Sequence, residues 1–153
     1  MISTYISYKV GKPPKNGYNY GDMTQPSSPP KTIAVLANPS IADAFQEAEN
    51  IIGHLESRGA DAQMGSMDDA GLRQSVQQKA FDLVIALGGD GTMLRAGHLC
   101  APVDVPLLGI NVGHFGFLAE LTRQNWRDAI PKLLSGDFRY EERMMMKASC
   151  LCD

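Results

Sequence analysis

The sequence predicts an α/β fold in which a parallel β-sheet is covered by helices on both faces. Short apolar, β-rich runs alternate along the chain with segments of helical periodicity, and this alternation is typical of parallel sheets. Two glycine-rich turns, at residues 88–92 and 109–118, each follow the end of such a run. Because ligands of these folds bind at the carboxyl ends of the strands, both turns are expected at one rim of the sheet.

The first strand and helix are predicted from composition and end signals. Residues 32–37 are apolar and β-rich, which suits a strand covered on both faces. The next helix is expected to start at a pair that approximates a capping box, Ser40 and Asp43. Gly59 is expected to end it in a left-handed conformation. Phe45, Ala48, Ile52 and Leu55 fall at helical spacing in this helix, with Ile51 beside them.

The middle of the chain continues the same alternation of strands and helices. Residues 60–64 form a weak strand, and residues 69–79 a polar helix with two apolar positions one turn apart. Residues 81–87 are the clearest buried strand. A short helix at 93–99 and a strand at 105–110 follow, so the second glycine-rich turn leaves the sheet at the end of the latter strand.

The last predicted helix lies between Thr122, its expected cap, and Gly136, which ends it. Pro131 falls inside this pattern. An interior proline costs a helix about 3 kcal/mol, so we expect a kink there, or a helix that restarts. Residues 138–150 alternate or run apolar, as a strand does.

Composition and charge exclude several classes of partner. The 153 residues are 44% hydrophobic and 20% charged, which is typical of a globular domain with a substantial core. A net charge of −3 provides no basic field for nucleic acid or anionic membranes. The chain starts without a secretory signal, and no apolar run approaches the ~20 residues that span a bilayer. We therefore expect a cytoplasmic protein with no nucleic-acid or membrane partner.

Residues 1–30 differ in composition from the rest. They are rich in Pro, Gly, Asn and Ser and show no period, so we expect a flexible leader. Regular structure is expected to begin at Lys31, and an α/β domain at 31–137.

The first turn is suited to holding phosphate. Its glycines let the backbone bend and approach a ligand, and its amides together with the following helix N-terminus attract anions. A carboxylate among such amides fits a group that accepts a hydroxyl proton, or one that orients nucleotide-bound magnesium. The alternative is an ordinary turn in which the acid or the threonine caps the helix. The candidate residues are Gly88, Gly89, Asp90, Gly91 and Thr92.

The second turn and the helix after the first turn add further candidates. Asn111 can read polar edges at the strand end, and Gly113 brings backbone to the rim. Phe117 either stacks on an adenine or packs in the core. Arg95 sits near the positive end of a helix, which favours anions; either an anionic ligand explains it, or it is a solvated surface arginine.

Together, the two turns resemble the signature of the NAD kinase family. LGGDGTMLRA (87–96) and GINVGHFGFLAEL (109–121) match it in order and at family-like spacing, and the resemblance covers about residues 32–148. It implies a Rossmann-like parallel sheet of the NAD kinase/phosphofructokinase amino-terminal type. It also implies transfer of a phosphoryl group from ATP, or polyphosphate, to the 2′-hydroxyl of the adenosine ribose of NAD, giving NADP.

The resemblance also implies roles for individual residues. Asp90 matches the catalytic acid that takes the hydroxyl proton, and Gly91 the neighbouring residue at the NAD site. Arg95 matches a position that contacts the dinucleotide, and Phe117 an aromatic residue near the adenine. Mg²⁺, or another divalent metal, would arrive with ATP, so we assign no side chain as a metal ligand. The full-length protein is expected to be a homo-oligomer.

One departure from the family keeps alternatives open. Family members continue into a second, all-β domain that completes the nucleotide site, whereas this chain stops at Asp153. We interpret residues 138–153 as the start of that truncated domain. One alternative function is a catalytically inactive nucleotide-binding fragment. Another is a lipid kinase of the diacylglycerol or sphingosine type, which shares only the first turn.

Overall fold

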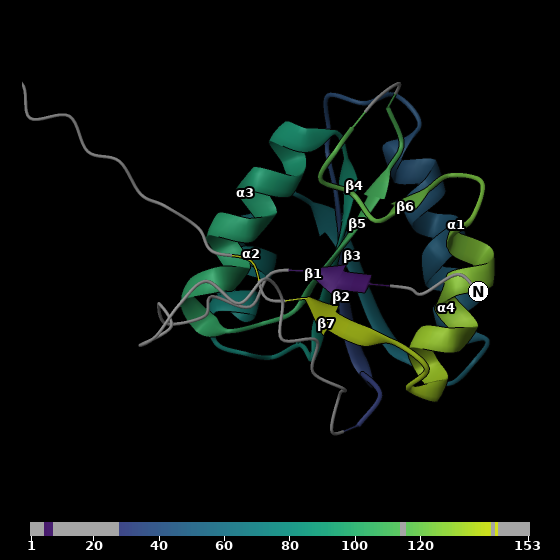
Figure 1. Cartoon of the computed structure of the whole chain (residues 1–153). Helices are drawn as coiled ribbons and strands as arrows, with labels where there is room; N and C mark the ends of the chain where they lie inside the picture. Colours follow the sequence, from purple (N-terminus) through teal and green to yellow (C-terminus); the bar gives the residue numbers. More distant parts are fainter. Residues whose placement is uncertain (1–4, 8–27, 114–115, 142, 144–153) are drawn as a thin grey trace, which may run out of the picture.

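The computed structural model describes residues 5–7, 28–113, 116–141 and 143. Five parallel strands form the main sheet in the order β3-β2-β4-β5-β6, and helices lie on both of its sides (Figure 1). The predicted α/β class is confirmed. The strands are β2 (Thr32–Ala37), β3 (Asp61–Ser66), β4 (Leu83–Gly88), β5 (Leu107–Asn111) and β6 (Leu121–Thr122).

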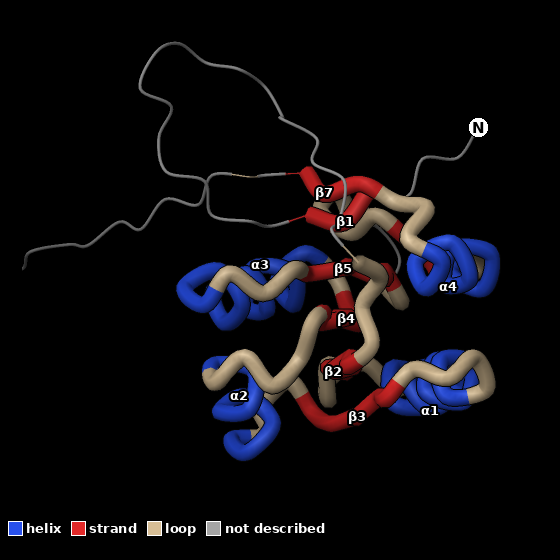
Figure 2. Tube along the Cα trace, turned by 90° about the horizontal axis from the view of Figure 1, so that it is seen from below, coloured by secondary structure: helices blue, strands red, loops and turns tan. Residues whose placement is uncertain are grey.

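In the part of the chain that the structure describes, four α-helices cover the sheet in two pairs. One pair, α2 (Ala70–Gln77) and α3 (Asp90–Cys100), lies on one face, and the other, α1 (Ala44–Glu56) and α4 (Trp126–Ser135), on the opposite face (Figure 2). A short 3₁₀ turn, η1 (Ala101–Val103), follows α3.

The central strands are buried on both faces, which explains why their sequences run apolar instead of alternating with polar residues. On β2, Ile33 and Val35 pack in the core under α1 and α4, whereas Ala34 and Leu36 pack in the core under α2 and α3. All residues of β4 are buried. The predicted strands at 32–37, 81–87 and 105–110 are confirmed, with ends shifted by at most two residues. The weak strand, β3, is at the edge of the sheet.

Three of the α-helices in the described ranges are each followed by a residue with a positive φ. Gly59 and Gly136 both have φ of 81°, as predicted. After α1, the amide of Gly59 donates to Glu56 O and that of Ala60 to Leu55 O, which is the Schellman arrangement. Lys79 after α2 also has a positive φ, of 58°. This left-handed residue was not predicted, because it is not a glycine.

Three predicted helix starts are wrong: the helix expected from residue 93 already begins at Asp90, and two others begin later than expected. The first helix begins at Ala44, and its N-cap Asp43 makes no side-chain capping bond. Thr122 belongs to β6 and caps nothing, because the residue before α4 is Asn125, whose Oδ1 accepts a hydrogen bond from the Thr122 amide at 2.7 Å. In both cases the chain needs extra residues to leave the sheet before it can turn into a helix.

The proline inside the last helix does not interrupt it. Of the two outcomes expected at Pro131, a kink or a restart, the restart is wrong, because the helix α4 runs unbroken from Trp126 to Ser135. Pro131 is exposed.

A second, two-stranded sheet lies beside β5 (Figure 2). Strand β1 (Tyr5–Ser7) pairs in parallel with β7 (Arg139–Glu141), so the expectation that regular structure begins only at Lys31 is wrong at these positions. The rest of the expected leader up to residue 27, and residues 144–153, lie outside the described residues. The domain boundaries stay a prediction. No helix in the described ranges is long and apolar enough to cross a membrane.

Candidate functional site

The two glycine-rich turns leave the sheet side by side. β4 ends at Gly88 and β5 at Asn111, and these two residues are paired in register across the two parallel strands. The first turn leads into α3, and the second leads toward β6. The expectation that both turns open on one rim of the sheet is therefore confirmed.

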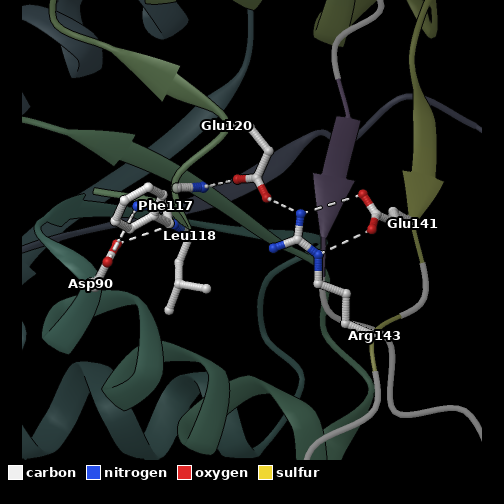
Figure 3. A network of polar contacts seen from close by, with 7 residues as sticks. Asp90, Phe117, Leu118, Glu120, Glu141 and Arg143 are labelled. Atoms are coloured by element: carbon white, nitrogen blue, oxygen red, sulfur yellow. Dashed lines mark hydrogen bonds and ion pairs between the residues drawn. The ribbon is translucent and has the colours of Figure 1, made fainter. Parts of the chain in front are cut away.

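Asp90 joins the two turns through its side chain. It is the first residue of α3, whose N-cap is Gly89. Its carboxylate accepts hydrogen bonds from the amide of Phe117, at 3.0 Å to Oδ1 and 3.2 Å to Oδ2, and from the amide of Leu118, at 3.0 Å to Oδ1 (Figure 3). The capping alternative is thus not the role of this side chain. The carboxylate is oriented by backbone and only partly buried, with lone pairs left for a further partner.

The glycines of the first turn serve two different steric purposes. A Cβ on Gly88 would lie 2.2 Å from Thr92 Oγ1, so this glycine lets α3 start directly against β4. Gly89 and Gly91 have no atom within 4 Å of such a Cβ, and the space beside their backbone is open. None of the three has a positive φ, so the backbone of this turn does not require glycine for a left-handed conformation. The absent side chains matter for contact and access.

Thr92 connects the first turn to the end of β2. Its side chain is buried, and its Oγ1 accepts a hydrogen bond from Asn38 Nδ2 at 2.8 Å. The backbone N–H of Asn38 donates to Leu87 O at 3.1 Å, and its side-chain Oδ1 accepts a hydrogen bond from the Ser40 backbone amide at 2.9 Å. The sequence patterns assigned no role to Asn38. Its position directly after a strand that ends at the same rim was the signal for a site residue.

The candidates of the second turn are held locally or exposed. Asn111 Oδ1 accepts a hydrogen bond from the Gly113 amide at 2.8 Å, which shapes the turn itself. Phe117 is 94% exposed, so the core-packing alternative for its ring is wrong and its faces are free to stack. A Cβ on Gly116 would lie 2.9 Å from both Asp90 Oδ1 and Asn111 Nδ2. This glycine therefore allows the close approach of the two turns.

Arg95 lies further from the helix start than expected. Because α3 begins at Asp90, Arg95 falls in the second turn, where the helix dipole no longer decides its environment. Its guanidinium forms an ion pair with Asp68, and both side chains are about half exposed. An internal anion therefore balances this cation.

Glu120 has a buried side chain. It lies within the second signature, but the sequence predicted no role for it. Its Oε2 accepts a hydrogen bond from the Gly109 amide at 3.0 Å, and its Oε1 lies 3.5 Å from Arg143 Nη2 (Figure 3). Burial raises the pKa of Glu120 to about 7, against the opposing effects of the Gly109 amide and Arg143. The only signal was an acid within the otherwise apolar run FLAEL.

No protein metal centre is formed by the residues that the structure describes: none of their His, Cys, Asp and Glu side chains gather in groups of three or more that could hold an ion. The site instead combines one oriented carboxylate, open space beside two glycines, an exposed aromatic ring and the N-terminus of α3. Such a combination can receive a phosphate-bearing ligand and take a proton from it.

Comparison with known proteins identifies relatives over most of the chain. A family model described as the ATP-NAD kinase N-terminal domain matches residues 33–138. An NAD kinase of Moorella thermoacetica is 40% identical over 123 residues, covering 76% of this chain and 40% of that protein. An NAD kinase of Natranaerobius thermophilus is 42% identical over 100 residues, covering 65% and 34%. The chain thus spans less than half the length of these relatives.

Among solved structures, a putative diacylglycerol kinase from Bacillus anthracis str. Sterne aligns with a TM-score of 0.42 and 20% identity, covering 54% of this chain and 32% of that one. A likeness at this level carries no argument about function.

Proposed function

The chain belongs to the NAD kinase family, and from this premise we propose that it forms the part of an NAD kinase that contains the catalytic base. The whole protein would transfer a phosphoryl group from ATP, or polyphosphate, to the 2′-hydroxyl of the adenosine ribose of NAD, giving NADP. The observation that carries the proposal is the Asp90 carboxylate, held by the amides of Phe117 and Leu118 where the two signature turns meet.

Asp90 would act as the general base. As the ribose oxygen forms its bond to phosphorus and the bond to the leaving ADP oxygen breaks, the carboxylate accepts the hydroxyl proton. Such help typically contributes ~10²–10⁴-fold to a rate. The two backbone amides keep the carboxylate in one orientation, which is the positioning that phosphoryl transfer depends on.

The remaining candidates would bind the substrates. The open space beside Gly89 and Gly91 suits a phosphate chain, with Gly88 and the buried Thr92 shaping the turn behind it. Mg²⁺ bound to ATP would supply charge neutralisation at the phosphates. The exposed ring of Phe117 would stack on the adenine.

Three further residues complete the proposed dinucleotide site. Asn111 and Gly113 would present polar groups at the end of β5. Arg95 would contact the dinucleotide after leaving its ion pair with Asp68, a pair that costs little to break because it is exposed. We also propose, from family membership, a cytoplasmic homo-oligomer.

The test is an NADP-formation assay on the full-length protein with NAD, ATP and Mg²⁺, accompanied by calorimetry with NAD and with ATP. Turnover supports the kinase. Binding of both nucleotides without turnover supports the alternative of an inactive nucleotide-binding module, and the absence of binding contradicts both. Diacylglycerol as phosphoryl acceptor is the control for the lipid kinase alternative. That alternative has less support, because the family match covers both signature turns, whereas lipid kinases share only the first.

A further inference from the structure

The segment of residues 117–120 is held at both ends by carboxylates. At its start, the amides of Phe117 and Leu118 donate to Asp90. At its end, Glu120 reaches back and accepts a hydrogen bond from the Gly109 amide in β5. Figure 3 shows the two carboxylates on either side of this short segment. The segment is therefore attached to α3 through one acid and to the sheet through the other.

The Glu120 carboxylate accepts a backbone N–H of β5 that would otherwise pair with a neighbouring strand. Pairing of β5 with β6 begins at Ile110 and Leu121, one residue after Gly109 and one after Glu120. The carboxylate thus takes the Gly109 N–H just before the ladder starts. The 117–120 segment lies close to the backbone of β5, because a Cβ added to Gly109 would lie 3.0 Å from Ala119 Cα and 3.2 Å from Glu120 Oε2. The absence of a side chain at position 109 therefore leaves room for the segment to lie this close to β5.

We infer, on the basis of the proposed function, that Glu120 is a positioning residue for Asp90. By accepting the Gly109 amide, Glu120 fixes the 117–120 segment on the sheet, and the segment in turn holds the amides of Phe117 and Leu118 against the Asp90 carboxylate. The base keeps its orientation only while that segment stays in place.

The hydrogen bond from the Gly109 amide to Glu120, and not the negative charge of Glu120, holds the segment in place. The Glu120 side chain is 7% exposed, and its Oε1 has no hydrogen-bond partner among the described residues; the nearest cation is Arg143 Nη2, at 3.5 Å. Arg143 is itself bonded to Glu141, so its charge is shared. A glutamine at position 120 can still offer an oxygen to Gly109, whereas an aspartate keeps the charge but is one methylene too short.

The experiment compares Glu120→Gln with Glu120→Asp in the full-length protein. We expect kcat for NADP formation to stay within about threefold of wild type in E120Q and to fall roughly 10- to 100-fold in E120D, the scale that a misplaced catalytic group produces. The KM for ATP should change little, whereas the KM for NAD should also rise in E120D, because the ring of Phe117, which we propose stacks on the adenine, belongs to the same segment. Glu141→Gln is the matched control, since it removes a neighbouring carboxylate that does not contact Gly109, and its kcat should equal that of wild type.

Amide hydrogen exchange of the peptide that contains residues 117–120 is a second measurement, independent of activity. Exchange at Phe117 and Leu118 should accelerate in E120D and stay near the wild-type rate in E120Q. Equal kcat and exchange in E120D and wild type would overturn the inference, as would a kcat loss in E120Q as large as in E120D. A wild-type protein that makes no NADP contradicts the proposed function instead, and the exchange rates then still decide whether Glu120 holds the segment.

Discussion

The carboxylate of Asp90 accepts a hydrogen bond from the backbone amide of Leu118 at 3.0 Å, across a separation of 28 residues. Asp90 opens α3, and Leu118 belongs to the segment that follows β5. The orientation of the proposed base is therefore set by a part of the chain that reaches it only through the pairing of β4 with β5.

Replacement of Asp90 by asparagine is expected to remove turnover and leave the fold intact. The amide oxygen of asparagine can still accept from Phe117 and Leu118, but it has no basicity to take the hydroxyl proton. A loss of about 10²-fold or more in kcat is expected. NADP formation and circular dichroism of the purified full-length variant measure the two effects, and a folded variant with wild-type kcat would refute the role of Asp90.

The substitutions Gly116→Ala and Gly91→Ala are expected to have different kinetic effects, because the first disturbs the orientation of Asp90 and the second the access of NAD. At Gly116 the new Cβ would meet Asp90 Oδ1 at 2.9 Å, so kcat should fall. At Gly91 nothing lies within 4 Å, so the fold should be unchanged and the KM for NAD should rise as the methyl group enters the open space. Steady-state kinetics with NAD as the varied substrate distinguish the two. The same kinetic effect from both substitutions would contradict this division.

Gly88→Ala is expected to destabilise the protein, because its Cβ would lie 2.2 Å from the Oγ1 and 2.5 Å from the Cβ of Thr92, which is buried. Overpacking of this kind typically costs ~1–3 kcal/mol. Gly53→Ala is the matched control: it lies within α1 with no atom within 4 Å of a built Cβ, and should stabilise by roughly 0.5–1 kcal/mol. Urea denaturation measures both, and opposite signs are required.

Glu120 predicts a pH dependence of stability. Burial raises its pKa to about 7 from 4.5, so the folded state binds the proton more tightly than the unfolded state does. The resulting stability is fully present below about pH 4.5 and is lost as pH rises through about 7. Relative to E120Q, which does not titrate, the wild-type free energy of unfolding should fall by up to roughly 3 kcal/mol over this window. Urea denaturation at a series of pH values measures the difference, and parallel curves for the two proteins would contradict the assignment.

The fold followed from patterns that are local in the sequence. The apolar runs at β2, β4 and β5 predicted strands buried on both faces, and the glycines at 59 and 136 predicted left-handed helix ends, because burial period and positive φ each depend on a few neighbouring residues. The helix starts were predicted less well. Ser40 and Thr122 matched cap preferences, yet the path of the chain off the sheet decided where α1 and α4 begin.

What the sequence determined by itself was the order of elements and the two turns that identify the family. Only the tertiary structure decided what the charged side chains contact: Asp90 bonds to the amides of a distant segment, Arg95 pairs with Asp68, and Glu120 takes the Gly109 amide. Each partner comes from a segment that is remote along the chain or lies on another strand. Strand order and register bring these groups within hydrogen-bond distance, and residue spacing alone does not contain that information.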